Sequence, residues 1–380
     1  MKKIKVVMVA DFPVGGERID GGVQAVSSYI VNGLKAIDDV DLSIVSFRSG
    51  MAEPVTVHEG HIPVYLLPRA PMGNITFYRR DLRSFLECLD KIKPDLIHSQ
   101  GATVEGYLSA KSGYPCVITF HGIIGEDAKY KATLRERFRF KLISWIAERY
   151  CVQSPCHKIL ISPYVQRYYG KQLKGVCRDI SNPIKADFYT LESRKEPGRI
   201  LFAGKLIRRK GVLNLIKALG LVNRSVDFNL VLAGALDDEA YVREIKDEIA
   251  VLGIQNRVTF LGLIDEKRVL EEFSKAAILV LPSYQETAPM VIQQAMAARV
   301  AVLATEICGV PDQLEKGDLG LMYHPDDLET CARHLNRLLT DTAFRSALIE
   351  RAHARALRDF HVDAVVKATV DLYHEVLLTR

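Results

Sequence analysis

The sequence predicts an α/β protein made of two doubly wound domains of parallel sheet. Short apolar runs alternate with helical periodicity along most of the chain, as expected for repeated βα units. A length of 380 residues suggests more than one domain. A charged, breaker-rich stretch at residues 192–198 (ESRKEPG) interrupts the alternation and indicates a linker.

The composition is that of a soluble globular protein, with 48% hydrophobic and 26% charged residues. Residues 1–13 begin basic and then turn apolar, but the run is short, stops at Asp11 and lacks a small-residue cleavage site. We therefore expect a cytoplasmic protein that starts with a strand. The seven cysteines are scattered without metal-site spacing, and reduced thiols are expected.

Positive charge is concentrated in the first half of the chain. The net charge is +5 overall, with +7 over residues 1–187 and −2 over the remainder. The segment from Lys129 to Arg149 contains seven basic residues and only two acidic ones, Glu136 and Glu148. This asymmetry predicts an anionic partner for the first half.

The first half opens with a continuous apolar run at residues 4–10, typical of a strand buried on both faces. Two glycine pairs, 15–16 and 21–22, precede a helix expected over Val23–Leu34. Such a turn lets backbone N–H groups approach a phosphate, although the glycine spacing does not fit a dinucleotide site. Further strands are expected at 41–47, 95–100, 116–121 and 158–163, with a strand and turn at 180–184.

His98 and His121 fall at the C-terminal ends of two of these strands, on the edge where open α/β sheets bind ligands. A lone histidine is more often structural than functional. Because His121 is followed by Gly122, a ligand role and a structural role are about equally expected for it.

The sequence predicts a helix over residues 131–150, within the basic segment Lys129–Arg149 and its next residue. Its apolar residues share one face, and the arginines lie elsewhere. The residues of the apolar face are Leu134, Phe138, Leu142, Trp145 and Ile146. We expect this face to pack on the sheet; a helix lying on a membrane surface is the alternative.

The second half repeats the alternation, with strands expected at 200–204, 228–234, 257–262, 278–282, 300–304 and 319–323. Cations follow the first of them: Lys205, Arg208, Arg209 and Lys210. Between a strand end and a helix start they could neutralise a diphosphate, although a solvated basic turn is the alternative.

Residues 281–297 (LPSYQETAPMVIQQAMA) run from a buried strand through a polar turn into a helix. Glu286 lies in the turn, Pro289 is expected in the first helical turn, and Gln294 lies eight residues after Glu286 near the same face. This is the ligand-binding edge of such sheets, although many similar turns only pack the core.

Several motifs together resemble the retaining nucleotide-sugar glycosyltransferases of family 4, which have the two-Rossmann GT-B fold. They are, in order, GGVQAV, PDLIHSQG, TFHG, ISNPI, FAGKLIRRKGVLNLIKAL, VTFLG, LPSYQETAPMVIQQAMAA and ATEICGVPD. The resemblance covers nearly the whole chain. It implies an acceptor-binding domain at 1–190, a donor domain at 191–360 facing it across a central cleft, and a last helix at 361–380 that crosses back.

The resemblance also implies site residues. Lys205 and Lys210 would clamp the donor diphosphate, Glu286 would bind sugar hydroxyls, and His121 would line the sugar pocket. The remaining donor-binding positions would be Gly22, Gly204, Gly234, Leu261, Gly262, Thr287, Ala288, Met290, Val291 and Gln294. The chain departs from the family at Gln294, usually glutamate, and at Lys205, usually arginine. It also departs at three usual glycines: Pro289, Arg299 and Cys308.

We therefore expect a metal-independent retaining transferase that moves a sugar from a UDP- or GDP-sugar to a glycan or lipid-linked acceptor in envelope polysaccharide, lipopolysaccharide or glycolipid synthesis. No other cofactor and no nucleic acid are expected. An anionic membrane surface is the expected partner of residues 129–149. The alternatives are a nucleotide-sugar epimerase on the same fold and a non-catalytic sugar-nucleotide-binding subunit.

Overall fold

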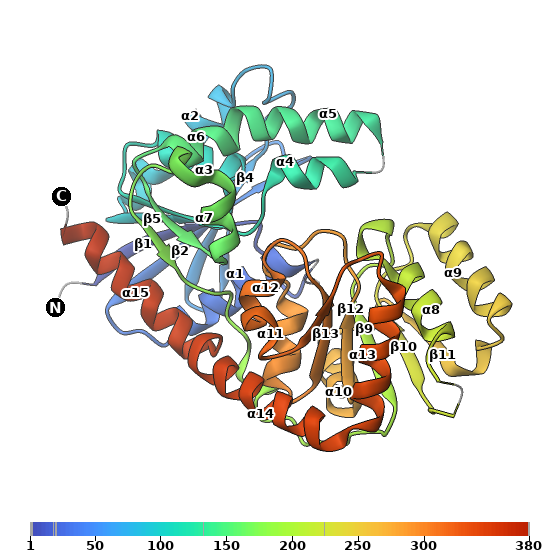
Figure 1. Cartoon of the computed structure of the whole chain (residues 1–380). Coiled ribbons are helices and arrows are strands. Elements are labelled where there is room, and N and C mark those ends of the chain that lie inside the picture. Colours follow the sequence, from blue (N-terminus) through green and yellow to red (C-terminus); the bar gives the residue numbers. More distant parts are fainter. Residues whose placement is uncertain (1–2, 18, 20, 132, 224, 379–380) are drawn as a thin grey trace. The chain divides into compact units, whose positions relative to one another are not determined.

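The computed structural model describes residues 3–17, 19, 21–131, 133–223 and 225–378. The chain forms two compact units (Figure 1). Unit 1 is Met1–Pro183 with Val362–Arg380, and unit 2 is Ile184–His361. The division after Pro183 precedes the expected linker, because residues 184–198 already belong to unit 2.

Unit 1 is built on an eight-stranded sheet in the order β3-β4-β2-β1-β5-β6-β7-β8, in which only β3 is antiparallel to its neighbour. The strands are β1 Ile4–Val9, β2 Val40–Arg48, β3 Val55–Glu59, β4 Ile62–Pro68, β5 Leu96–Ser99, β6 Cys116–Phe120, β7 His157–Leu160 and β8 Cys177–Asp179. The strand expected at 180–184 is instead β8, just before it, while Ile184 forms a single bridge with His361 in unit 2.

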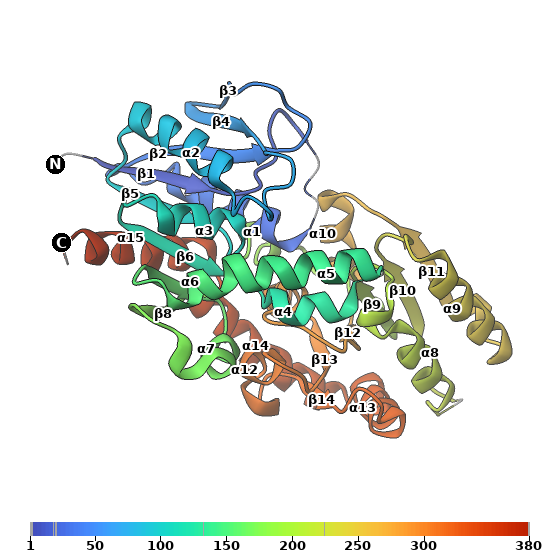
Figure 2. The same ribbon diagram turned by 90° about the horizontal axis from the view of Figure 1, so that it is seen from above.

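Helices cover this sheet, as two perpendicular views show (Figures 1 and 2). The α-helices are α1 Gly22–Leu34, α2 Arg79–Ile92, α3 Val104–Lys111, α4 Ile124–Asp127, α5 Leu134–Ile143, α6 Arg149–Gln153, α7 Pro163–Tyr169 and α15 Val362–Leu378. A π-helical turn, η2 Ser144–Glu148, joins α5 to α6. The 3-10 turns are η1 Ala128–Tyr130 and η3 Gly170–Gln172.

Unit 2 is a six-stranded parallel sheet in the order β11-β10-β9-β12-β13-β14. Its strands are β9 Arg199–Ala203, β10 Asn229–Ala233, β11 Val258–Gly262, β12 Ile278–Leu281, β13 Ala301–Thr305 and β14 Leu321–Tyr323. Its α-helices are α8 Val212–Gly220, α9 Glu239–Val251, α10 Glu266–Lys275, α11 Met290–Ala297, α12 Val310–Gln313, α13 Leu328–Thr340 and α14 Thr342–Asp359. The 3-10 turns are η4 Ala186–Phe188, η5 Arg208–Lys210, η6 Gln255–Arg257 and η7 Glu315–Gly317.

The four central strands of unit 2, β9, β10, β12 and β13, are buried on both faces, because successive residues that point to opposite sides are buried. Phe202 belongs to the apolar cluster on one face and its neighbour Leu201 to the cluster on the other. This double burial explains why the strands could be recognised as continuous apolar runs.

The last helix, α15, belongs to unit 1 and packs against α1. A Cβ added at Gly33 of α1 would lie 2.4 Å from a methyl group of Val366, so the two helices approach closely only because residue 33 is glycine. Tyr373 of α15 is completely buried. The helix is therefore part of the core of unit 1.

The expectation that the apolar face of the 131–150 helix packs on the sheet holds only toward its C-terminal end, where Ile146 is buried in the core of unit 1 and Leu142 packs against that core. No residue of α5 is buried, and Leu134, Phe138 and Trp145 are 81%, 69% and 59% exposed. Figure 1 shows α5 reaching beyond the sheet of unit 1. Periodicity placed these residues on one face but could not show how much of that face the core covers.

The expectation of reduced cysteines also fails for one pair. Cys116 and Cys156 form a disulfide with a Cα–Cα distance of 5.4 Å. They stand at the starts of the adjacent strands β6 and β7, so strand pairing joins residues 40 positions apart. No helix among the described residues is long and apolar enough to span a bilayer.

Candidate functional site

The carboxyl ends of β9 and β12 bring together the two most informative stretches of the second half. These strands are neighbours in the sheet of unit 2, so the turns that follow them meet at one edge. The first turn carries η5 with its cations, and the second carries Glu286. In open α/β sheets this edge is where ligands bind.

Lys210 and Glu286 form an ion pair there. Lys210 Nζ donates to Glu286 Oε1 at 2.5 Å, and the Ser283 hydroxyl donates to the same oxygen at 2.8 Å. The Glu286 side chain is only 9% exposed, so the pair is largely screened from water. The two residues expected to bind a diphosphate and a sugar therefore share one polar cluster.

Arg209 ties the two turns to each other. Its Nη1 donates to the Gln285 carbonyl at 2.6 Å and to the Gln285 side chain at 3.0 Å, while Tyr284 N donates to the Arg209 carbonyl at 2.8 Å. Arg208 points elsewhere and pairs with Glu244. Arg209 Nη1 also lies 3.9 Å from Glu286 Oε2, so Arg209 belongs to the same polar cluster as Lys210, whereas Arg208 does not.

Glycines allow the backbone segments of this edge to approach one another closely. A Cβ on Gly211 (φ +64°) would lie 2.0 Å from the Pro282 carbonyl oxygen. A Cβ on Gly234 (φ +154°) would lie 1.8 Å from the carbonyl oxygen of Gly204. Any side chain at these positions would push the turns apart.

The other predicted donor-binding residues of unit 2 follow the same strand ends. Thr287 and Ala288 are buried in the turn, and Met290, Val291 and Gln294 are half-buried on α11. Leu261 and Gly262 end β11, and Lys205 is exposed just after β9. Pro289 is the N-cap of α11 and not part of its first turn, with a φ of −65° that suits a helix start.

In unit 1, His121 follows β6 and is held by a buried chain of hydrogen bonds. Its Nε2 lies 2.8 Å from Gln100 Oε1, and the side chain of Asn182 is also hydrogen-bonded to it. Gln100 in turn reaches His98 Nε2 at 3.2 Å. Burial lowers the pKa of His121 to about 4, so the ring is neutral near pH 7.

The sequence predicted His98 at the C-terminal end of its strand, but the residue lies inside β5 and is completely buried. Its Nδ1 contacts the Tyr373 hydroxyl at 2.6 Å and its Nε2 the Thr119 hydroxyl at 2.8 Å. Burial, with a smaller effect of His121, lowers the pKa of His98 to about 3. His98 is thus a structural part of the chain that leads to His121.

Glu148 fixes the backbone just after His121. Its carboxylate accepts hydrogen bonds from Ile124 N at 2.6 Å and Gly125 N at 3.1 Å, and from the Tyr169 hydroxyl at 2.7 Å. Burial raises the pKa of Glu148, although these hydrogen bonds partly oppose the rise. The sequence showed Glu148 only as one charge within a basic segment.

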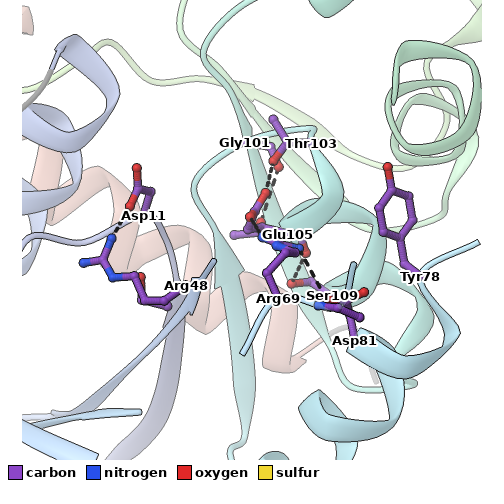
Figure 3. Close-up of polar contacts among 12 residues, drawn as sticks. Asp11, Arg48, Arg69, Tyr78, Asp81, Gly101, Thr103, Glu105 and Ser109 are labelled. Carbon is purple, nitrogen blue, oxygen red and sulfur yellow. Dashed lines mark hydrogen bonds and ion pairs between the residues drawn. The ribbon is translucent and has the colours of Figure 1, made fainter. Parts of the chain in front are cut away.

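Gly22, the predicted phosphate contact of unit 1, is the first residue of α1, and Gly21 before it has a φ of +102°. The preceding loop is pinned by Arg48 at the end of β2. Arg48 pairs with Asp11 at 2.7 Å (Figure 3) and with Glu17 at 3.0 Å. Sequence reasoning did not find this pair, because its members lie far apart along the chain.

A second polar cluster at this edge was also missed (Figure 3). Arg69, just after β4, pairs with Glu105 of α3 and lies 3.9 Å from Asp81 of α2. Burial would raise the pKa of Glu105, but Arg69 and the Thr103 hydroxyl hold it below its usual value. No cluster of three or more His, Cys, Asp or Glu side chains that could hold a metal ion occurs among the described residues.

Two doubly wound units, each with candidate ligand-binding residues at the carboxyl edge of its sheet, are typical of the GT-B class of glycosyltransferases. Comparison with known proteins supports this assignment. The model for glycosyl transferases group 1 matches residues 184–355, and the model for glycosyltransferase family 4 matches residues 20–187. The chain belongs to the family 4 glycosyltransferases. The predicted fold and family are confirmed.

Among curated relatives, an uncharacterised glycosyltransferase of Methanocaldococcus jannaschii (MJ1607) is 28% identical over 46% of this chain and 44% of its own length. The α-D-kanosaminyltransferase of Streptomyces kanamyceticus is 27% identical over 70% and 71%. Several of these alignments, including the first, span only about half or less of the relative's length.

Solved structures show the same fold over the whole chain. Sucrose-phosphate synthase of Thermosynechococcus elongatus superposes with a TM-score of 0.81 at 20% identity, covering 100% of both chains. The Anabaena protein HepE, solved with UDP-glucose, superposes with a TM-score of 0.73 at 18% identity, covering 98% of this chain and 100% of that one.

Proposed function

We propose that this chain is a retaining glycosyltransferase that moves a sugar from a nucleoside-diphosphate sugar to a glycan or lipid-linked acceptor. The observation that carries the proposal is the Lys210–Glu286 pair at the carboxyl ends of β9 and β12. It combines a cation for phosphate with a carboxylate that can accept hydrogen bonds from sugar hydroxyls.

Transfer requires the nucleoside diphosphate to leave, which creates negative charge on its phosphates. Lys210, joined by Lys205 and the N–H groups of nearby turns, would stabilise that charge where it develops. Glu286 would orient the donor sugar. No metal is needed for these roles.

We assign no protein residue as the base. The ring of His121 is already hydrogen-bonded to Gln100 and to Asn182 and stays neutral, which suits a wall of the sugar pocket better than proton transfer. In the retaining reaction the acceptor would attack from the face that the diphosphate leaves, and a departing phosphate oxygen would take its proton.

The donor we propose is a UDP- or GDP-sugar. The UDP-glucose complex of HepE, a protein with the same fold, favours uridine. Gln294 is half-buried on α11 and would hydrogen-bond the ribose, which an amide can do as donor and as acceptor. Strand ends at Gly234, Leu261 and Gly262 would hold the base.

The acceptor partner we propose is presented at an anionic membrane surface, as in envelope polysaccharide, lipopolysaccharide or glycolipid synthesis on the cytoplasmic face. Residues 129–149 supply the positive charge, and Arg135, Arg137 and Arg139 are all exposed. Charge reversal of these three arginines to glutamate should abolish co-sedimentation with anionic vesicles. Equal binding to anionic and neutral vesicles at low salt would contradict this partner and leave the transferase proposal standing.

A thermal-shift screen against nucleotide sugars tests the proposal directly, because a ligand that binds the folded state raises its melting temperature. We expect one nucleotide base to stabilise the wild type, and the corresponding diphosphate alone to do so as well. Stabilisation by none of the UDP-, GDP-, ADP- and dTDP-sugars would overturn it. Conversion of the donor sugar without acceptor would identify an epimerase, and binding without turnover would identify a non-catalytic subunit.

A further inference from the structure

Large apolar side chains are exposed on two segments of unit 1. In the loop before α2, Met72, Ile75 and Phe77 are 69%, 67% and 49% exposed, and the α5–η2 segment adds Leu134, Phe138 and Trp145. We call these six residues the apolar rim. Scattered exposed apolar residues are ordinary on a protein surface, whereas exposed apolar residues of two separate segments that meet at a groove indicate a binding surface.

A groove joins the two segments. Phe77 and Trp145 both line it, together with Tyr107 and Tyr150, whose ring centroids lie 5.1 Å apart. Arg149 also lines the groove and is exposed. The groove is thus largely aromatic, with a cation on its wall.

Ion pairs and a hydrogen bond fix the start of the loop that carries half of the rim. Arg69, at its start, pairs with Glu105 and Asp81 (Figure 3), and Asp81 also accepts a hydrogen bond from Ala70 N at 3.0 Å. Met72 and Phe77 have φ values of 56° and 50°, a conformation that L-residues adopt at a cost. Backbone strain is therefore concentrated in the loop that carries these exposed side chains.

Exposed cations flank both segments of the rim. Arg79, Arg80 and Arg83 begin α2 directly after the loop, and Arg135, Arg139 and Lys141 lie on α5. A ligand that satisfies both the rim and these cations must be apolar in one part and anionic in another. A membrane lipid with an anionic headgroup has this chemistry.

We propose that the apolar rim enters the surface of an anionic lipid bilayer, with the groove between Phe77 and Trp145 taking a lipid hydrocarbon chain and the arginines contacting headgroup phosphates. The proposal rests on the proposed function only for the identity of the acceptor. It extends the partner surface beyond residues 129–149 to the 70–78 loop, and it requires apolar insertion in addition to charge attraction.

Trp145 makes the proposal directly measurable, because it is the single tryptophan of the chain. Vesicles of phosphatidylglycerol and phosphatidylcholine should shift its fluorescence emission to shorter wavelength. Lipids brominated on their acyl chains should quench that emission. Vesicles of phosphatidylcholine alone should do neither at the same lipid concentration.

The matched variants are Phe77→Ser on the rim and Leu263→Ser in unit 2, where the leucine is 60% exposed. We expect Phe77→Ser to weaken vesicle binding at least tenfold, and Leu263→Ser to leave it unchanged. Melting temperature and circular dichroism establish that both variants fold. A second variant, Phe138→Ser, carries the same expectation should Phe77→Ser unfold.

Three results would overturn the proposal. Binding to vesicles without quenching by brominated chains would show charge attraction alone, and equal binding by the Phe77→Ser and Leu263→Ser variants would show that the rim is not involved. A wild-type dimer in the absence of lipid, lost in Phe77→Ser, would assign the rim to a second copy of the chain. None of these measurements uses a sugar donor. Their outcome is therefore independent of whether the transferase proposal is correct.

Discussion

The Tyr373 hydroxyl of the last helix lies 2.6 Å from Nδ1 of His98, at the far end of the hydrogen-bond chain that reaches His121 through Gln100. All members belong to unit 1, and both Tyr373 and His98 are completely buried. In this way α15 takes part in orienting a side chain at the carboxyl edge of the sheet. The resemblance predicted that the last helix returns to the first domain, but not this contact.

Removing the Tyr373 hydroxyl should therefore affect both stability and His121. Tyr373→Phe leaves a ring nitrogen of His98 buried without its partner, at a cost of about 1–3 kcal/mol in the free energy of unfolding. Nitrogen NMR of the imidazoles should also show an altered tautomer equilibrium at His98 and His121. Tyr189→Phe, which removes a hydroxyl bonded to the Ala356 carbonyl in unit 2, is the control and should leave both histidines unchanged.

The buried histidines should make stability depend on pH. The pKa of His98 is about 3 in the folded protein, below its value of about 6.5 in the unfolded chain. The unfolded state therefore binds the extra proton first, and stability is full above pH 6.5 and falls as the pH drops toward 3. The slope from His98 should approach about 1.4 kcal/mol per pH unit. Urea unfolding between pH 7.5 and 5 measures it, and an unchanged slope in a folded His98→Asn variant would contradict this assignment.

Gln294 offers a test of the ribose assignment. Gln294→Glu introduces the residue usual in the family, and because the side chain is only half-buried we expect the variant to fold. The dissociation constant for the nucleoside diphosphate, measured by calorimetry, should stay equal or decrease. Unfolding of this variant would instead show that residue 294 belongs to the core packing of α11.

At two positions where the family usually has glycine, the backbone of this chain adopts a left-handed conformation. The φ values are 54° at Arg299 and 46° at Cys308. A side chain there costs about 1–2 kcal/mol, whereas glycine costs about 0.5–1 kcal/mol through the entropy of the unfolded chain. Cys308→Gly should therefore be more stable than Cys308→Ala by up to about 1 kcal/mol in chemical denaturation. Both variants lack the thiol, so their difference isolates the Cβ atom. A less stable glycine variant would refute the strain argument.

The sequence predicted unit 2 far better than the polar clusters of unit 1. All six strands of unit 2 lie where their apolar runs indicated. The four central strands are the clearest of these, because a strand buried on both faces is apolar at nearly every residue. The hairpin of β3 and β4 was missed, since β3 is largely exposed at the sheet edge and carries no continuous apolar run.

The positions of Lys210 and Glu286 could be anticipated because each residue follows a recognisable strand end, but their ion pair was not predicted. The contact of Arg69 with Glu105 could not, since Arg69 follows β4, a strand that the sequence patterns did not indicate, and Glu105 lies on α3 outside any motif. The bond between Cys116 and Cys156 depends on the pairing of β6 with β7, which the cysteine spacing did not indicate. Sequence patterns thus located residues at the sheet edges, while their partners required the fold.

The most direct test of the account compares two neighbouring cations of η5. Lys210 pairs with Glu286 at the proposed donor site, whereas Arg208 pairs with Glu244. We predict that Lys210→Ala lowers kcat/KM for the donor found in the nucleotide-sugar screen. The decrease should correspond to a loss of about 2–4 kcal/mol of transition-state stabilisation, which is typical of removing one electrostatic donor. Arg208→Ala should keep nearly full activity and the wild-type melting temperature. Lys210→Ala takes the nearest cation away from the buried Glu286 carboxylate, so we expect a lower melting temperature, and circular dichroism must show that this variant is folded before its turnover is compared. Equal turnover by the wild type and Lys210→Ala would contradict the proposed donor site.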